Sequence, residues 1–297
     1  MDQDRRAASG YLLSLAAFAL WGLFPIYFKA VGSVSPLEVL AHRILWSVPV
    51  CAFFLTWQKG WPALRAALAH ARVLAALGLT SGLIAANWLI FIYAVMSGQV
   101  LAASLGYFLS PLMSLALGMI FLGERPGRWQ VAALTLAGLG GLNLVLFLGA
   151  LPWISLSLAL SFSIYGLLRK TVAVEAVGGL LVETALLAPL ALAWLLWLGR
   201  QGQLAFVSQG PEITLLLLSA GLLTSLPLIW FTAGARRIPL YGVGLCQYVT
   251  PSLHFLLAVV LYREPFTTVH LITFALVWAG LALYLAAGSP WLRRKRA

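Results

Sequence analysis

Arg43 and Glu183 are the side chains whose types and spacing most readily suggest chemistry. Arg43 precedes Pro49 by six residues, and Glu183 precedes Pro189 by six. Both lie in strongly apolar sequence, where an ionisable group costs roughly 2.5–3.5 kcal/mol even on a lenient membrane-insertion scale. Opposite charges at equivalent places could hold an ionic substrate between them, and a structural ion pair is the alternative. We interpret both residues as candidates for substrate binding.

Glu38 and His42 precede Arg43 on the same predicted helix and stand four residues apart. Residues at this spacing share a helix face, and that face is only slightly rotated from Arg43. All three could line one aqueous vestibule, in which a histidine could relay protons. A hydrogen bond between packed helices is the alternative role for His42. We include Glu38 and His42 among the candidate binding residues and expect His254, alone on a later helix, to pack.

A second group of candidates offers flat aromatic walls and a few hydrogen-bonding groups, which is the usual lining of a small-molecule pocket. Its members are Trp21, Asn87, Trp88, Tyr93, Tyr107, Trp230, Gln247 and Tyr248. Packing between helices is the alternative for each of them.

Pro111 and Pro251 occur inside apolar runs, and each follows a hydroxyl residue, Ser110 or Thr250. A proline inside a helix removes one backbone hydrogen bond, and a nearby hydroxyl can bond a carbonyl that is left free. The pattern predicts paired kinks at which two helices bend as gates. Static kinks are the alternative.

The sequence lacks the signatures of several other classes of protein. No Walker motif, no Gly-x-Ser-x-Gly elbow and no His/Cys spacing typical of metal ligands occurs, and Cys51 and Cys246 both lie in apolar stretches. The net charge of +11 is spread between hydrophobic runs, whereas nucleic-acid binding clusters basic residues on one face. We therefore expect no cofactor, no metal, no catalytic residues and no nucleic-acid partner. A lipid scramblase or flippase, a channel and a membrane-embedded transferase remain as alternative functions.

The candidate residues must be positioned by membrane helices, because 62% of the chain is hydrophobic and only 9% is charged. Apolar runs that are ended by Gly, Pro or charge predict ten transmembrane helices in an all-α integral membrane protein. They are Tyr11–Gly32, Pro36–Trp57, Val73–Met96, Val100–Gly123, Trp129–Gly149, Pro152–Leu168, Val177–Leu198, Ile213–Ala235, Pro239–Leu261 and Val269–Ala287.

The basic residues predict the orientation, because cytoplasmic loops retain an excess of Lys and Arg. With the N-terminus inside, 15 of the 19 basic residues lie on the cytoplasmic side, two lie on the far side, and Lys29 and Arg43 lie within helices. Both termini are then cytoplasmic. Arg5 and Arg6 precede the first apolar run, and no small-residue cleavage site follows it, so we expect a first membrane helix and not a removed signal peptide.

The second half of the chain repeats the first. Tyr-Phe-Leu-Ser-Pro at 107–111 aligns with Gln-Tyr-Val-Thr-Pro at 247–251, and an acid follows each proline by thirteen residues, Glu124 and Glu264. Pro49 and Pro189 share this offset of 140, and Gly82 aligns with Gly221 at 139. We predict two five-helix repeats, 1–149 and 150–297, in one membrane domain. Five is an odd number, so the repeats must be inverted, which is the basis of alternating access around a midplane site.

Glycines are dense in the fifth and tenth predicted helices, including Gly138, Gly140, Gly141 and Gly280. Small residues let helices approach closely, so these two helices could form a packing or dimer surface. A monomer and a homodimer are both compatible with the sequence.

Several short motifs resemble the RarD branch of the EamA family, in the drug/metabolite transporter superfamily. They are Trp-Gly-Leu-Phe-Pro at 21–25, His-Arg-Ile-Leu-Trp-Ser at 42–47, Asn-Trp at 87–88, Glu-Thr at 183–184 and Gln-Tyr-Val-Thr-Pro at 247–251. The resemblance covers nearly the whole chain. It implies ten helices in two EamA repeats, a bacterial inner-membrane location and an exporter or permease role, and the branch is nominally associated with chloramphenicol sensitivity. We expect a secondary active transporter of small amphipathic or charged metabolites or drugs, with or without coupling to ions or protons.

Overall fold

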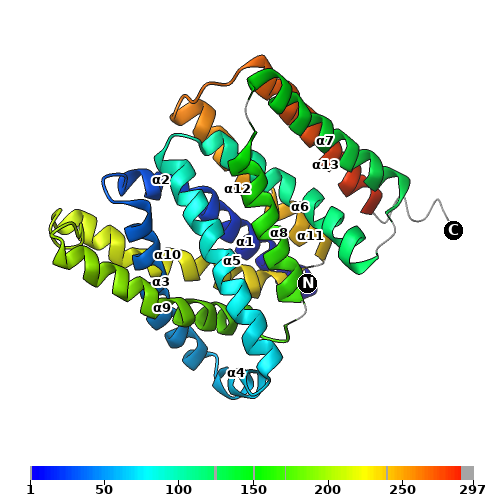
Figure 1. Ribbon diagram of the computed structural model, residues 1–297. Helices are drawn as coiled ribbons and strands as arrows, with labels where there is room; N and C mark the ends of the chain where they lie inside the picture. Colours follow the sequence, from blue (N-terminus) through cyan, green and yellow to red (C-terminus); the bar gives the residue numbers. More distant parts are fainter. Residues whose placement is uncertain (1, 124–125, 150, 171, 239, 289–297) are drawn as a thin grey trace.

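The computed structural model describes residues 2–123, 126–149, 151–170, 172–238 and 240–288. Within these ranges every regular element is a helix (Figure 1). In chain order the helices are α1 (Asp2–Gly22), α2 (Phe24–Ala30), α3 (Pro36–Trp57), α4 (Trp61–Leu68), α5 (Ala71–Met96), α6 (Val100–Leu122), α7 (Arg128–Leu148), α8 (Trp153–Lys170), α9 (Ala176–Arg200), α10 (Pro211–Ala235), α11 (Leu240–Gln247), α12 (Val249–Leu256), the π-helical turn η1 (Leu257–Leu261) and α13 (Thr268–Gly288).

Nine segments of the described chain are long and apolar enough to cross a membrane. They comprise α1 with α2, then α3, α5, α6, α7, α9, α10, the segment from α11 to η1, and α13. The chain is therefore a multi-pass membrane protein.

Helix α8 falls at the sixth of the ten runs expected from the sequence, but it is not among these nine segments. It carries several serines and ends in Arg169 and Lys170, which lowers its hydropathy. Its serines bond neighbouring helices: Ser155 Oγ donates to the carbonyl of Ala102 at 2.7 Å, and Ser163 Oγ donates to that of Ser110 at 2.9 Å. Contact with α5 and α6 thus compensates the polarity of α8.

Two of the expected helices are interrupted. The sequence predicts continuous helices over 11–32 and 239–261, but the first breaks at Leu23 and the second breaks at Tyr248. Pro25 and Pro251 follow the breaks, and a proline cannot donate to the carbonyl four residues before it. The carbonyl of Trp21 accepts a hydrogen bond from His254 Nε2 instead, at 3.2 Å.

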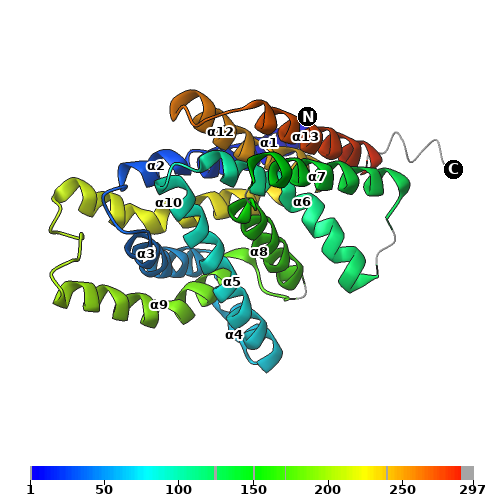
Figure 2. The ribbon, with the colours of Figure 1, turned by 45° about the horizontal axis from the view of Figure 1, so that its top comes forward.

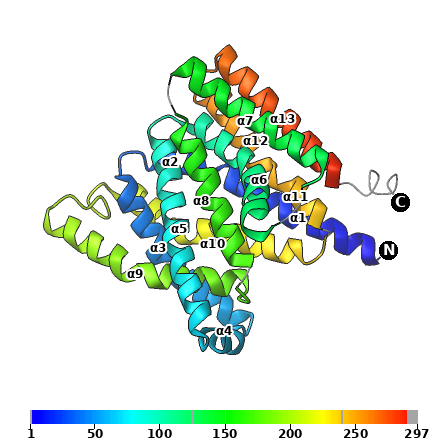
Figure 3. The same ribbon diagram turned by 45° about the vertical axis from the view of Figure 1, so that its right-hand side comes forward.

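Helices from distant parts of the sequence pack side by side. In all three views α7 and α13 form a pair at one edge of the molecule (Figures 1, 2 and 3). Helix α3 packs on α9 and α10, α6 packs on α8 and α12, and α1 packs on α10, α11 and α12. The short helix α4 lies at one end of the molecule, where it contacts α5 (Figure 2).

Glycines permit the close approach of α7 and α13. A Cβ added at Gly280 would lie 2.8 Å from the carbonyl oxygen of Ala133, and one at Gly140 would lie 3.2 Å from that of Thr273. Both glycines therefore form the contact between α7 and α13. A Cβ at Gly138 or Gly141 would meet no described atom within 4 Å.

Candidate functional site

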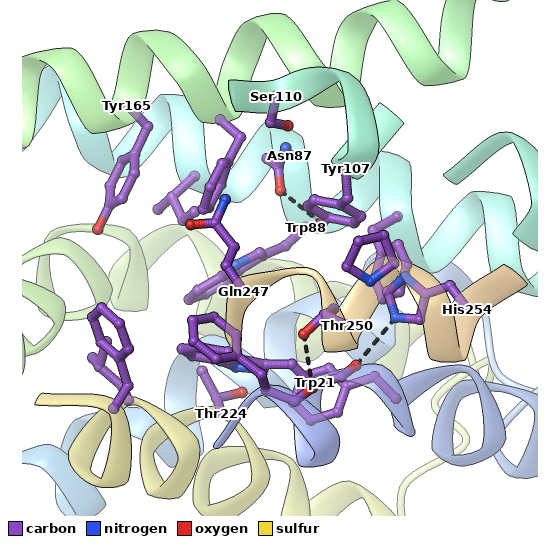
Figure 4. A pocket seen from close by; sticks show the side chains of 18 of the residues that line it. Trp21, Asn87, Trp88, Tyr107, Ser110, Tyr165, Thr224, Gln247, Thr250 and His254 are labelled. Atoms are coloured by element: carbon purple, nitrogen blue, oxygen red, sulfur yellow. Dashed lines mark hydrogen bonds between the residues drawn. The ribbon is translucent and has the colours of Figure 1, made fainter. Parts of the chain in front are cut away.

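A cavity of about 300 Å³ lies among the packed helices, and we call it the central cavity. Figure 4 shows that its walls are largely aromatic rings, with amide, hydroxyl and imidazole groups between them. Its lining consists of Phe18, Trp21, Phe24, Arg43, Ile84, Asn87, Trp88, Phe91, Tyr107, Ser110, Phe162, Tyr165, Leu180, Thr224, Leu228, Phe231, Gln247, Tyr248, Thr250, Pro251 and His254. The helices that carry these residues come from both halves of the chain.

Some of the residues singled out from the sequence lie in this lining, and others do not. The cavity includes Trp21, Arg43, Asn87, Trp88, Tyr107, Gln247, Tyr248 and Pro251. The remaining candidates, Glu38, His42, Tyr93, Pro111, Glu183 and Trp230, are not among the residues that line it.

Arg43 is held by an aromatic face and a hydroxyl group. Its side chain is on α3, and only 5% of the residue is exposed. The Nε atom donates to Thr224 Oγ1 at 2.8 Å, and the guanidinium carbon lies 4.1 Å from the centre of the Trp88 ring. The Nη1 atom is buried and has no hydrogen-bond partner among the described residues. A charge in this environment is stabilised by cation–π attraction but is not neutralised.

Glu183 is fully buried on α9 and has different neighbours. Its Oε1 accepts from Thr80 Oγ1 at 2.7 Å, and its Oε2 accepts from the hydroxyl of Tyr165 at 3.2 Å. The nearest described base is Arg169, whose Nε lies 3.8 Å from Oε1. The ion pair that was the alternative for Arg43 and Glu183 is therefore not formed, and Glu183 does not face the cavity as expected, because it faces α5 and α8. It lies one side chain behind the cavity wall, since Tyr165 lines the cavity.

Glu38 and His42 hold the loop before α10. The carboxylate of Glu38 accepts from the backbone N–H groups of Ala205 and Phe206, at 2.7 and 3.1 Å. His42 Nδ1 accepts from the indole N–H of Trp46 at 3.1 Å, and its ring lies 4.7 Å from that of Phe206. In place of the expected vestibule, both side chains are in a packed interface, because their helix face points toward this loop.

Three candidates are close in sequence to lining residues but do not line the cavity themselves. They are Tyr93, Trp230 and Pro111. Tyr93 is 42% exposed and packs against Trp153 at 5.9 Å between ring centres, in a separate outer groove. Trp230 is partly buried, and its neighbour Phe231 lines the cavity instead. Pro111 is inside the uninterrupted helix α6. Of the two helices that were expected to kink, only the second is broken, near Pro251.

Asn87 and Tyr107 form a fixed polar pair in the wall. The amide nitrogen of Asn87 donates to the carbonyl of Leu158 at 3.1 Å and to Ser161 Oγ at 2.9 Å. Its amide oxygen accepts from the hydroxyl of Tyr107 at 3.3 Å. Three helices, α5, α6 and α8, are connected through this one side chain.

The broken helices α1–α2 and α11–α12 meet at the cavity (Figure 4). Thr250 Oγ1 donates to the carbonyl of Phe18 at 2.7 Å, and His254 Nε2 lies 3.2 Å from the carbonyl oxygen of Trp21. Since a carbonyl only accepts, His254 carries its proton on Nε2. We expected His254 only to pack between helices, but it also lines the cavity.

Other lining residues were also missed, although the sequence carries a signal for them. Phe18 and Trp21 have the spacing of Phe162 and Tyr165, at an offset of 144 residues. All four line the cavity, and they come from the first helices of the two expected repeats.

Glu264 makes a second carboxylate–backbone contact, outside the cavity. Its two oxygens accept from the N–H groups of Val100 and Leu101, at 2.7 and 2.8 Å, at the N-terminus of α6. Burial raises the pKa of this carboxyl, while the two N–H groups and nearby Lys29 act to lower it. The residue that matches it in the repeat, Glu124, lies outside the described residues.

The described residues contain no group of three His, Cys, Asp or Glu side chains that could hold a metal ion. Cys51 and Cys246 are both buried and free, and Cys51 Sγ lies 3.3 Å from Ser225 Oγ. The polar groups of the cavity are thus suited to binding an organic molecule through hydrogen bonds, one positive charge and aromatic contact.

Known proteins resemble the chain over nearly its whole length. An uncharacterized transporter of Vibrio cholerae is 42% identical over 290 residues, which cover 97% of this chain and 96% of that protein. The protein RarD of Escherichia coli is 41% identical over 282 residues, 95% of each chain. The EamA-like transporter family matches residues 8–147.

The chain belongs to the EamA-like transporter family, alongside the RarD proteins. The chloramphenicol-sensitive protein RarD of Pseudomonas aeruginosa is 38% identical over 283 residues, 94% of each chain. A solved crystal structure is 19% identical, with a TM-score of 0.56, and the match covers 93% of this chain and 96% of that chain. That likeness shows that the fold of this EamA-like transporter is shared with a protein of known structure.

Proposed function

We propose that this chain is a secondary transporter that carries a small amphipathic or charged metabolite or drug across the bacterial inner membrane by alternating access. The central cavity is its binding site, and ten helices in two inverted five-helix repeats, 1–149 and 150–297, surround that site. Helix α8 is the sixth of these ten. Transport is driven by a substrate or ion gradient, protons included.

Residues that are 140 positions apart line the cavity in pairs, and this observation carries the proposal. At the offset of 140 residues, lining residues of the first half match lining residues of the second. The pairs are Ile84 with Thr224, Trp88 with Leu228, Phe91 with Phe231, Tyr107 with Gln247, and Ser110 with Thr250. A site built from equivalent positions of two inverted repeats is the geometry in which the repeats can exchange conformations around it.

The packing of the helices supports the same symmetry. In the proposed repeats α8 is the counterpart of α1, α9 of α3, α10 of α5, and α12 of α6. Helix α6 contacts α8 as α12 contacts α1, and α5 contacts α8 as α10 contacts α1. Helix α3 contacts α10 as α9 contacts α5. Three further contacts, α3 with α9, α6 with α12 and α7 with α13, join elements at matching places in the two repeats. Exchange of the two halves thus leaves this pattern of neighbours unchanged.

The proposed membrane location and orientation rest on the distribution of basic residues and on the bacterial relatives. The excess of basic residues in alternate loops supports cytoplasmic termini. The relatives named above come from bacteria, and a helical multi-pass protein with loops this short suits the bacterial inner membrane.

Thiol labelling tests alternating access without knowledge of the substrate. Single cysteines replace Ser110 or Thr250, which face the cavity at equivalent positions, after Cys51 and Cys246 are replaced by alanine. We expect a membrane-impermeant thiol reagent to reach each cysteine from either side, in right-side-out and in inside-out vesicles. Leu139→Cys on the exposed face of α7 is the control and should stay unlabelled, because lipid excludes a charged reagent.

Labelling of both positions from one side only would contradict alternating access and would indicate a static pocket. Passage of the reagent through the protein into closed vesicles would indicate a channel. Uptake into liposomes, with and without a proton gradient, then separates proton-coupled transport from uncoupled transport.

A further inference from the structure

The central cavity contains a positive charge that its lining does not balance. Arg43 lines the cavity, and no Asp or Glu is among the described residues of the lining. The nearest buried acid behind the wall, Glu183, is bonded to Thr80 and Tyr165 and lies 3.8 Å from Arg169. A cavity with one guanidinium and no acid disfavours a cationic ligand and favours an anionic one.

One donor of the guanidinium has no acceptor in the described structure. Its Nε is used by Thr224 at 2.8 Å, and Thr224 in turn donates to the carbonyl of Ala220 at 2.8 Å. Its Nη1 is buried without a partner in the described structure, although only 5% of Arg43 is exposed. A buried charged donor without an acceptor is costly, and an anionic ligand oxygen would remove that cost.

The surroundings of Arg43 favour a flat apolar body. The guanidinium lies 4.1 Å from the centre of the Trp88 ring and 5.4 Å from that of Phe24. Gln247 reaches between the rings into the cavity, and its amide has no hydrogen bond to another described residue (Figure 4). The volume of about 300 Å³ is at the lower end of the range for small-molecule pockets.

We propose that the central cavity binds a small organic monoanion whose carboxylate or sulfonate pairs with Arg43 and whose flat apolar body lies between the aromatic rings. This inference rests on the proposed function and names its substrate class. A single guanidinium matches one negative charge, so a dianionic phosphate would remain half neutralised. A neutral molecule could accept a hydrogen bond from Nη1 but would leave the charge of Arg43 uncompensated, and a cation would be repelled.

Three ligands with the same ring system but different charge test the proposal: indole-3-acetate, its neutral amide and the cationic amine tryptamine. Binding to the purified full-length protein is followed by the thermal shift and by isothermal titration calorimetry. We expect the acid to bind at least about tenfold more tightly than the amide, because the amide oxygen can accept a hydrogen bond from Arg43 but does not neutralise its charge. The amine should bind more weakly than both.

Variants at Arg43 assign the selectivity to this side chain. Arg43→Gln should bind the acid and the amide equally, whereas Arg43→Lys should keep part of the preference, because it retains the charge without the planar fork. Arg200→Gln is the matched control, since Arg200 is exposed at the end of α9 and outside the cavity. The comparison of the three ligands on the unaltered protein needs no variant, so misfolding of a variant does not remove the test.

Equal or tighter binding of the amine, unchanged selectivity in Arg43→Gln, or no binding of the acid at millimolar concentration would each overturn the anion site. Two-sided labelling of Ser110→Cys and Thr250→Cys needs no ligand. If that labelling persists while acid selectivity is absent, only the substrate class is wrong; if labelling is one-sided, the proposed function itself fails.

Discussion

At the scale of single residues, Arg43 and Glu183 act in separate environments. Their side chains share no hydrogen-bond partner among the described residues, since Arg43 donates to Thr224 while Glu183 accepts from Thr80 and Tyr165. Removal of an uncompensated buried charge is often neutral or stabilising, whereas removal of one partner from a bonded pair is destabilising.

We therefore expect opposite effects of the two substitutions on thermal stability. Glu183→Gln should destabilise the protein by roughly 1–3 kcal/mol, because it removes the acid beside Arg169. Arg43→Gln should be neutral or stabilising in the empty protein. The double variant should show additive effects within about 0.5 kcal/mol, measured by thermal unfolding in detergent. A coupling energy well above this value would mean that the two charges interact after all.

The sequence could predict which residues are unusual, but not which way each one points. Arg43, Tyr107 and Gln247 were predicted as lining residues and do line the cavity, because polar or charged groups deep in a membrane helix are costly unless they are used. Glu183 is equally unusual, yet it faces a neighbouring helix. Helix rotation depends on packing across the whole bundle, which no local pattern specifies. Trp230 was chosen as an aromatic residue deep in a helix, and its neighbour Phe231 lines the cavity instead.

At the scale of helices, the runs of apolar sequence predicted the positions of the helices closely, whereas the break at Leu23 was not predicted and kinks were expected at both Pro111 and Pro251. Leu23 and Tyr248 leave the helix two and three residues before a proline, and at the first break His254 of the partner helix donates to the carbonyl of Trp21. Pro111 stays inside a continuous helix under the same local chemistry. The difference therefore arises from tertiary contacts, such as that of His254 with Trp21.

Helices α7 and α13 supply a test of packing by small residues. Gly280→Leu should weaken or prevent their contact, because even a Cβ there would lie 2.8 Å from the carbonyl oxygen of Ala133. Gly138→Leu is the control on the same helix pair, since a Cβ there meets no described atom within 4 Å. We expect a loss of at least about 2 kcal/mol for the first and little change for the second, measured by thermal unfolding.

Equal losses in both glycine variants would show that the cost comes from the changed residue type and not from close packing. A change of oligomeric state in Gly138→Leu alone would instead place an interface between copies on the open face of α7.

At the scale of the whole molecule, orientation follows from the basic residues. Cysteines at Gln99 and Gln201 should be labelled from the outside of intact cells, and cysteines at Arg65 and Arg237 should be labelled only after permeabilisation. The background for this experiment lacks Cys51 and Cys246. Outside labelling at Arg65 or Arg237 would reverse the predicted orientation.

The contact of Glu264 with α6 has a consequence for the speed of the transporter. It connects the segment after η1 to the first turn of a helix from the other half of the chain, through two backbone N–H groups. Under the proposed cycle, we expect both bonds to break and the carboxylate to be hydrated when the two halves separate at this contact. The bonds would then contribute to an activation barrier, while Glu264 itself is outside the cavity lining. We therefore expect Glu264 to govern how often the protein turns over and not how tightly it holds its cargo.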